Sequence, residues 1–584
     1  MTIRKINNLS FLIFLAGFFL MALLAITLLF SSAGFFAGLP IGRWQFPLGL
    51  LVTCLIVYKL YVKSEHQHVG SDLYIIIGLP IAITIFSLLF SAYFYDRSYD
   101  GQAYHMEAII QLKQGWNPYW QKLPNSVNQV LWVSHYAKGM ETVQAAIYGA
   151  FNNIEAGKAT NVILWVGSFF LTLSYLCRRF WVSLTKSVII SALLASNPIV
   201  MNQMISTYVD GPMASMLLSL IVTGLFLMEK AKPRYLLLLA ILVILLVNVK
   251  FTALLYLGLF VGGFFVWALL IKKVKTAKKI WWTSVVSGVI AILVGFNPYI
   301  VNTIQHENPL YPLVGKDKVD IIHELNLPAG FEGKSGIERF FISFFATTDN
   351  IYPKSGNHAE LKIPFTFNII DAKNAGVVDA RLGGFGPMFS GIFLLSLIPL
   401  IAILIKVKRQ LFSVITIWLT ILIVISVVMM PESWWARYVP QLWFLPLIWL
   451  FSSEALLPGK LKIVKGFMYA GLVVNLIFCF GGFLLNIILT NKIDYQLSQL
   501  KSSKQLIMVD WGDSAGNRIR FEDHGIPYKE VNLHKVKVGE GKEYMAGSQT
   551  WFIVPDHIDH NLHEPWLVKA TGKRIPYMWE YYGR

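Results

Sequence analysis

Long apolar stretches recur along most of this chain, separated by short polar connections. Each stretch holds roughly 17 to 25 residues, the length that an α-helix needs to cross about 30 Å of hydrocarbon. The pattern predicts an all-α polytopic membrane protein with about thirteen spans. They cover approximately residues 11–31, 44–62, 73–95, 160–177, 186–203, 207–228, 234–249, 251–271, 281–303, 386–406, 411–430, 438–455 and 464–489.

The composition agrees with this class. Of the 584 residues, 55% are hydrophobic and only 14% are charged, and the mean hydropathy is +0.56. One soluble core cannot hide that much apolar surface. The first stretch follows Arg4 and Lys5 and is too long for a cleaved signal peptide, so we expect a retained anchor. The three cysteines fall in or beside predicted spans and indicate neither disulfides nor a metal site.

The net charge of +17 is distributed like that of a membrane protein and does not indicate a nucleic-acid partner. Clusters of Lys and Arg occupy the short connections, which is the positive-inside pattern. Placing all of them in the cytoplasm puts the N-terminus inside, and residues 96–158, 304–385 and 490 onward outside. The clusters are Arg4/Lys5, Lys59/Lys63, Arg178/Arg179/Lys186, Lys230/Lys232/Arg234, residues 272–279, Lys406/Lys408/Arg409 and Lys460/Lys462/Lys465.

The tail differs from the rest of the chain. "KQLIMVDW", "YKEVNLH" and "SQTWFIVP" read as short strands between polar turns, with helical stretches before the first and after the last. The sequence therefore predicts a membrane domain over 1–490 and a small extracytoplasmic α/β domain over 491–584. The tail also holds His557, His560 and His563, but their spacing matches no standard zinc site, so no metal or other cofactor is predicted.

Ionisable side chains gather directly after the third predicted span, in "FYDRSYDGQAYHMEAI". Asp96, Arg97, Asp100 and His105 lie within ten positions of a chain that is poor in charge. Asp100 is a good N-cap for a helix beginning at Gln102, which would explain one acid but not the group. A carboxylate beside the membrane surface can instead act as a general base, which typically contributes about 10²- to 10⁴-fold in rate.

The residues that follow predict a short helix. Tyr104, Ala108, Ile109 and Leu112 share one helical stripe, and "GWNP" at 115–118 ends it. We expect an amphipathic helix lying along the membrane interface.

The stretch "YDGQAYHMEAI" resembles the first-loop motif of the GT-C superfamily of membrane glycosyltransferases, in particular the aminoarabinose transferase and protein mannosyltransferase group. In that group an acid is followed four positions on by Tyr, and Asp100 with Tyr104 fits this spacing. "HENPLYPL" at 306–313 and "WWARYVPQLWFLP" at 434–446 are similar to further segments of the same group. The likeness covers most of residues 1–490. One departure is Gly101, which stands where many relatives have a second acid.

The resemblance implies an enzyme of the cytoplasmic (inner) membrane that takes a sugar from a polyprenyl-phosphate donor. The acceptor would be an envelope glycan, a lipid or a protein on the outer face, and the reaction would invert the sugar. Asp100 or Asp96 would be the general base. Cations would stabilise the leaving phosphate. The expected substrate-binding residues are Tyr104, His105, Arg97, Arg437 and Arg381.

Other readings stay open. Arg437 and Arg381 could serve only as interfacial anchors, and Asp210 and Lys250, near predicted span ends, are explained by snorkelling. A transporter or flippase for a lipid-linked glycan is the leading rival, although it should carry ionisable groups near the bilayer midplane. An outer-face glycan polymerase or ligase is a third class, favoured by the large segment 304–385.

Overall fold

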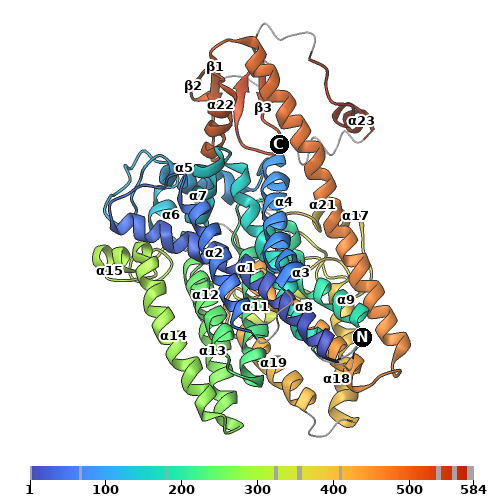
Figure 1. Ribbon diagram of the computed structural model, residues 1–584. Helices are drawn as coiled ribbons and strands as arrows, with labels where there is room; N and C mark the ends of the chain where they lie inside the picture. Colours follow the sequence, from blue (N-terminus) through green and yellow to red (C-terminus); the bar gives the residue numbers. More distant parts are fainter. Residues whose placement is uncertain are drawn as a thin grey trace.

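The computed structural model describes residues 3–64, 69–178, 182–320, 326–350, 358–406, 411–533, 541–555 and 562–574. Over these residues the protein is mostly helical, with one small sheet near the C-terminus (Figure 1). Eight of the described helices are long and apolar enough to cross a membrane. They are α1 (Ile3–Phe36), α2 (Gln45–Val62), α4 (Leu79–Tyr93) with η1 (Tyr74–Gly78), α8 (Ala159–Cys177) with η3 (Glu155–Lys158), α11 (Asp210–Glu229), α13 (Thr252–Leu270), α14 (Val274–Val294) and α21 (Lys462–Ser503).

Each of these helices coincides with a predicted span. The other five predicted spans contain the shorter helices α9 (Leu184–Ala195), α12 (Pro233–Val249), α18 (Phe389–Lys406), α19 (Leu411–Val428) and α20 (Phe444–Leu456). The break expected near Lys250 is confirmed, since α12 ends at Val249 and α13 begins at Thr252. A membrane protein of the α class is therefore supported, while the number thirteen stays a prediction.

Shorter elements fill the connections. They are α3 (Val69–Leu73), η2 (Gly101–His105), α5 (Met106–Lys113), α6 (Val130–His135), α7 (Gly139–Phe151), α10 (Pro198–Gln203), η4 (Phe296–Ile300), α15 (Val301–His306), α16 (Gly336–Phe344), α17 (Ile369–Asn374), η6 (Ala436–Tyr438) and η7 (Pro440–Trp443).

The centre of the bundle is formed by helices that are apolar all round, as expected of buried helices. Helix α1 packs against α2 and α8, and its Leu15, Phe18 and Leu24 are inaccessible. Helix α11 packs against α8 and is buried over its whole apolar window. In helices α14 and α21 only 28% of the apolar window is buried inside the protein, which leaves the rest available for lipid contact.

The predicted helix after Asp100 is present as η2 and α5, and it ends at Lys113 as expected. Its position along the membrane interface is not confirmed. Ala108, Ile109 and Leu112 are buried, and α5 packs against α7 on one side and the C-terminal unit on the other. The apolar stripe belongs to a protein core.

The C-terminal unit begins inside a helix. Helix α21 has 42 residues and continues past position 490, where the domain boundary was predicted. Its last turns carry an apolar stripe of Leu489, Ile493, Leu497 and Leu500, which packs into the core of the small unit. The membrane part and the unit are thus joined by one continuous helix, which Figure 1 shows rising to the sheet.

The sheet has four short strands in the order β2-β1-β4-β3. Three coincide with the predicted segments, and β3 was not predicted. Strands β1 and β2 are parallel and joined through α22, whereas β4 is antiparallel to both β1 and β3. The elements are β1 (Ile507–Asp510), α22 (Arg518–His524), β2 (Tyr528–Glu530), β3 (Lys542–Tyr544), β4 (Trp551–Ile553) and α23 (Trp566–Arg574).

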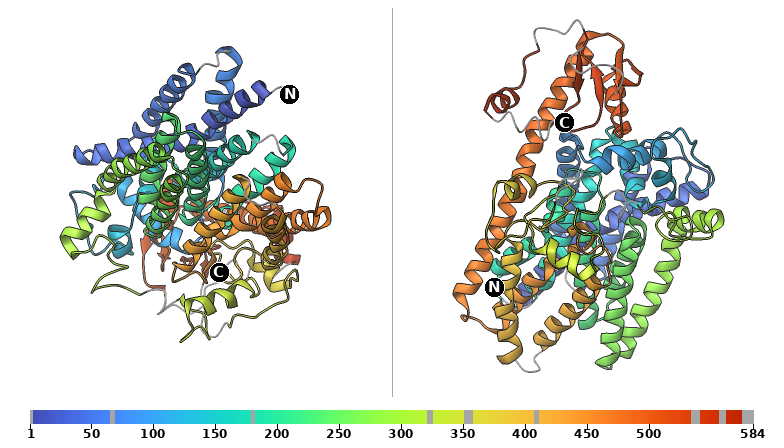
Figure 2. Two further views of the ribbon diagram at one scale, coloured as in Figure 1. Left: turned by 90° about the horizontal axis from the view of Figure 1, so that it is seen from below. Right: turned by 180° about the vertical axis from the view of Figure 1, so that it is seen from behind.

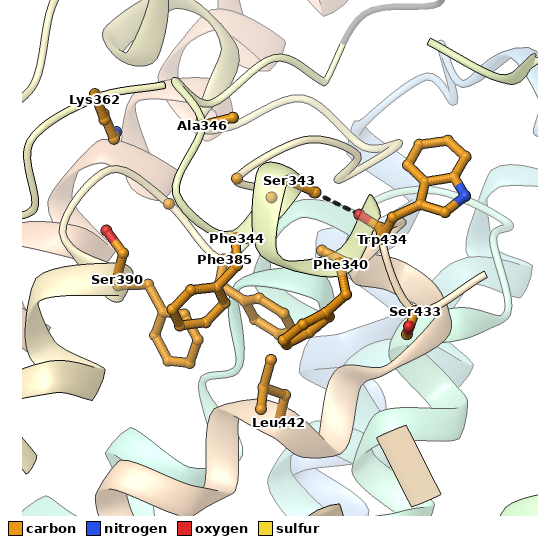
Figure 3. Close-up of a pocket in the computed structure, with 15 residues that line it drawn as sticks. Phe340, Ser343, Phe344, Ala346, Lys362, Phe385, Ser390, Ser433, Trp434 and Leu442 are labelled. Carbon is orange, nitrogen blue, oxygen red and sulfur yellow. Dashed lines mark hydrogen bonds between the residues drawn. The ribbon is translucent and has the colours of Figure 1, made fainter. Parts of the chain in front are cut away.

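Part of the segment 304–385 is fastened to the connection before α20. Ser343 of α16 donates its hydroxyl to the backbone carbonyl of Trp434 at 2.5 Å (Figure 3). The rings of Phe340, Phe344 and Phe385 close around a residual space of about 20 Å³. A space of this size holds about one water molecule, so it is a packing contact and not a substrate site.

Candidate functional site

A cavity of about 1010 Å³ lies among the connections at one end of the helices. Its walls come from residues 96–137, 205–210, 249–252, 313–379 and 430–438, with contributions from α21 and the C-terminal unit. Six of the seven expected site residues line it, namely Asp96, Arg97, Asp100, Tyr104, His105 and Arg437.

Arg437 lies at the centre of the charged groups in this cavity. It belongs to η6 and is 7% exposed. Its Nη1 lies 3.2 Å from Asp100 Oδ2 and 3.5 Å from Asp210 Oδ2, and its Nε lies 3.0 Å from Asp379 Oδ1. Three carboxylates from distant parts of the chain thus meet at one guanidinium.

Two further cations extend this cluster. Lys250 Nζ lies 2.5 Å from Asp210 Oδ1, and Arg381 Nε lies 3.2 Å from Asp379 Oδ2. The cluster therefore contains three carboxylates and three basic side chains, and each carboxylate contacts at least one of the basic side chains. This pairing keeps their buried charges balanced. The snorkelling interpretation of Asp210 and Lys250 is wrong, because both side chains turn into the cavity and Asp210 is 1% exposed.

The electrostatics divide the cluster into two kinds of group. Burial raises the pKa of Asp379 above its ordinary value, although Arg437 and Arg381 lower it. Burial lowers the pKa of Arg437, but the surrounding Asp379, Asp210 and Asp100 outweigh it and raise the pKa further. Arg437 therefore stays charged, whereas burial makes the ionised form of Asp379 less favourable than it is in water.

Asp100 does not cap the helix that it precedes. It occupies the N-cap position of η2 but makes no side-chain capping hydrogen bond. The carboxylate instead accepts from Arg437, and 20% of the side chain is exposed in the cavity. The capping hypothesis is wrong for this residue, and its carboxylate faces the space that a substrate would enter.

Asp96 is held very differently. It is fully buried, and each carboxylate oxygen accepts two hydrogen bonds. Oδ1 accepts from the backbone and hydroxyl of Ser98 at 2.8 and 2.6 Å, and Oδ2 accepts from the backbone and hydroxyl of Thr207, both at 2.7 Å. These bonds fix the backbone before Asp100 and occupy both oxygens of Asp96, so Asp100 is the more accessible of the two carboxylates.

Three of the other expected residues, His105, Tyr104 and Arg97, line the same cavity as Asp100 and Asp96. His105 Nδ1 lies 2.5 Å from Oε1 of buried Glu141, and the ring of Tyr104 stacks obliquely on His105 at 4.3 Å. Burial raises the pKa of Tyr104 well above its ordinary value, so the phenol stays neutral. Arg97 donates from Nε to Asn486 of α21 at 2.9 Å.

Arg381 contacts the cluster through Asp379. It is 2% exposed and is not among the described residues that line the cavity. Its guanidinium lies 4.0 Å from the ring of Trp435 and pairs with Asp379. Arg381 is thus placed to hold Asp379 against Arg437 rather than to meet a ligand directly.

Asp379 was not predicted from the sequence, and Asp210 and Lys250 were expected only to snorkel. Asp379 lies two residues before Arg381 in "VVDARLGG". An acid so close to a flagged Arg in a polar segment was the available signal. For Asp210 and Lys250, the signal was that opposite charges stood at the ends of two neighbouring predicted spans.

A second ionic cluster fastens the C-terminal unit to the backbone of the first loop. Arg520 of α22 is 2% exposed and donates to Glu155 Oε1 at 2.7 and 3.0 Å and to the Asp96 carbonyl at 2.6 Å. Glu155 Oε2 accepts from the Asp96 backbone at 3.0 Å and pairs with buried Lys158. The unit therefore helps to position the chain that leads to Asp100.

Replacing Arg520 by Ala is expected to loosen the C-terminal unit. The change leaves a carboxylate and a carbonyl buried without one of their donors, and breaking a buried pair costs about 3 to 5 kcal/mol. Thermal unfolding and limited proteolysis of the purified protein would measure the effect. Lys492→Ala is the matched control, because Lys492 meets Glu543 and Glu564 only at 4.0 and 3.8 Å and is partly exposed. It should cost less than about 1 kcal/mol. Equal effects would contradict the positioning role.

Among the described residues, no group of three or more His, Cys, Asp or Glu side chains is arranged to hold a metal ion. His557 and His560 lie outside the described residues.

The fold and the cavity define a mostly helical protein with eight candidate membrane-spanning helices among the described residues and a charged site at one end of its helices. Comparison of the sequence with protein-family models and with curated proteins gave no match.

Proposed function

We propose that this chain is an integral membrane glycosyltransferase of the GT-C type. It would move one sugar from a polyprenyl-phosphate donor to an envelope glycan, lipid or protein acceptor at the outer face of the cytoplasmic membrane. The observation that carries the proposal is the pairing of Asp100 with Arg437 at 3.2 Å in the wall of a cavity of about 1010 Å³. A carboxylate and a fixed cation facing one space are the two groups that this transfer needs.

The proposal includes a topology with thirteen spans, the N-terminus inside and the C-terminus outside. The origin of the cavity walls supports it. Every lining segment comes either from a connection or tail that the Lys and Arg distribution assigns to the outside or from the adjoining end of a predicted span, although these segments are scattered from residue 96 to residue 549. If one of the intervening spans had been assigned incorrectly, some of the lining segments would fall on the cytoplasmic side and others on the outer side.

The chemistry is a single displacement with inversion. An acceptor hydroxyl or amine attacks the anomeric carbon, and the bond from that carbon to the phosphate oxygen breaks with its electron pair passing to the phosphate. Asp100 takes the proton from the acceptor as the new bond forms. Arg437 neutralises the charge that gathers on the lipid phosphate, and a guanidinium suits this role because it donates in a fixed fork.

The arrangement favours an enzyme over a flippase. A transporter is expected to place ionisable groups near the bilayer midplane in broken helices. Here the cluster around Arg437 lies where several helices end or begin, as at Asp210 and Lys250. The polymerase or ligase class keeps one argument in its favour, because Asp379 reaches Arg437 from the large segment 304–385.

The test is incubation of the purified protein with a panel of polyprenyl-phosphate sugars and envelope extracts, followed by mass spectrometry of the products. Transfer from one monophosphate-linked sugar supports the proposal. Use of a diphosphate-linked glycan alone would select the ligase class. Movement of lipid between leaflets without a covalent change would select the flippase.

A further inference from the structure

Large apolar side chains are exposed on one face of the chain between α16 and α18. We call this surface the apolar ledge, and each of its members is between 40% and 74% exposed. Six large apolar side chains exposed within ten residues are unusual for a surface that faces water, so the ledge requires a partner. Its members are Leu361, Ile363, Phe365, Phe367, Ile369 and Ile370.

The ledge is anchored directly on two apolar helices. The ring of Phe365 lies against Gly391 of α18, and a Cβ built on Gly471 of α21 would lie 3.6 Å from the same ring. The rings of Phe367 and Phe478 of α21 are 5.0 Å apart. Helix α17, which follows, also packs against α21, and Figures 1 and 2 show this part of the chain beside the middle of that helix.

These contacts give the depth of the ledge. Gly471 and Phe478 lie within the predicted span 464–489 and within the most apolar part of the chain's longest helix. At 1.5 Å per residue they stand about 10 and about 21 Å from the start of that span. The hydrocarbon layer is about 30 Å thick. The ledge therefore lies beside the interior of the span, not beyond its end.

The two charged side chains within residues 361–371 are largely withdrawn from solvent. Residues 361–371 contain two charged side chains, Lys362 and Asp371, and these pair with each other at 2.6 Å. Asp371 is inaccessible and Lys362 is 9% exposed at its side chain. Neutralisation inside the protein is what a segment in contact with hydrocarbon needs.

Part of the irregular backbone is satisfied within the protein as well. The Lys362 amide donates to the Phe345 carbonyl at 2.9 Å, and the Asn368 amide donates to Asp371 Oδ2 at 3.0 Å. Non-helical backbone at membrane depth is tolerated where protein groups supply such partners.

The exposed faces of the neighbouring helices continue the same surface. Ile398 and Ile401 of α18 are 43% and 52% exposed, and Ile477 and Phe480 of α21 are 63% and 50% exposed. These side chains face the surroundings of two apolar helices. The ledge extends that apolar surface, and its two charged side chains do not interrupt it because they pair with each other inside the protein.

We propose that residues 361–370 are embedded in the membrane and that the partner of the apolar ledge is the acyl chains of the bilayer. This part of segment 304–385 then dips beside α21 instead of standing in water above the membrane. The inference depends on α21 crossing the bilayer and does not depend on the proposed transfer chemistry.

The test measures where the ledge stands in a bilayer. Ile363→Cys and Phe367→Cys, each in a Cys54→Ser background, are labelled with an environment-sensitive fluorophore in the full chain and reconstituted into phosphatidylcholine vesicles. Quenching is measured with nitroxides on the acyl chains and with aqueous iodide. Ile477→Cys serves as the lipid reference. Trp566→Cys on α23, where Trp566 is 75% exposed, serves as the aqueous reference.

We expect both ledge positions to be quenched by acyl-chain nitroxides within about twofold of position 477, and to resist iodide at least fivefold better than position 566. Quenching by iodide as at position 566 would overturn the proposal, because the ledge would face water. Resistance to both quenchers would also overturn it, because another protein surface would cover the ledge. Leu361→Cys replaces either variant that fails to keep the wild-type melting temperature.

Discussion

Asp100→Asn is expected to abolish sugar transfer while the protein remains folded. Asn has nearly the same shape as Asp but cannot take a proton from the acceptor, so the rate should fall about 10²- to 10⁴-fold. Folding should survive, because Arg437 keeps Asp379 and Asp210 as counter-ions. The single-turnover rate with a monophosphate-linked sugar, together with the melting temperature of the purified protein, measures both results.

A second measurement separates a base from a structural acid. In the wild type, the Asp100 carboxylate accepts a hydrogen bond from the Arg437 guanidinium and offsets part of its charge. The Asn variant should therefore bind the donor phosphate at least as tightly as the wild type does. Asp513→Asn is the matched control, because Asp513 lines the same cavity and accepts from Tyr99 at 3.0 Å. It should transfer at close to the wild-type rate. Near wild-type transfer by Asp100→Asn would remove Asp100 from the mechanism.

Changes at Arg437 are expected to have the next largest effect. Arg437→Gln leaves Asp100, Asp210 and Asp379 without their common cation, and an uncompensated buried charge costs about 3 to 5 kcal/mol. Arg437→Lys keeps the charge but loses the fork that reaches several oxygens at once. The Lys variant should stay folded and lose about 10- to 100-fold in transfer, which corresponds to one or two charged hydrogen bonds.

Comparing the two variants distinguishes binding of phosphate from stabilisation of the fold. Thermal unfolding should report a loss for Gln alone, and transfer assays should report a loss for both. Lys318→Gln is the control, because Lys318 lines the cavity but is 58% exposed at its side chain. Wild-type transfer by Arg437→Lys would show that its fork does not hold the leaving phosphate.

Hydropathy located the helices well because burial in lipid demands long runs without charge. The predicted spans 73–95 and 234–249 illustrate this, since α4 ends at Tyr93 and α12 ends at Val249. Shorter elements were harder. Strand β3 holds three residues, Lys542–Tyr544, with no apolar alternation, and its place is set by pairing with β4.

The candidate site was only partly predictable, because some of its contacts join residues that are far apart in the sequence. The motif around Asp100 could be recognised locally, and Arg437 could be flagged by its residue type at a span end. The pairing of Asp379 with Arg437 could not be predicted, because the two residues are far apart in the sequence and only the fold brings them to 3.0 Å. The same holds for Glu155, whose partner Arg520 belongs to the C-terminal unit.

The unbroken course of α21 has a mechanical consequence. A helix is stiff over this length, and its far end supplies Leu497 and Leu500 to the core of the small unit. We therefore expect a change in the tilt of this helix within the lipid to be transmitted to the unit and to its Asp513 and Gln549, which border the cavity. Because bilayer thickness influences the tilt of such helices, the lipid composition around the protein is expected to influence the cavity, against the restraint of the buried contacts of Arg520.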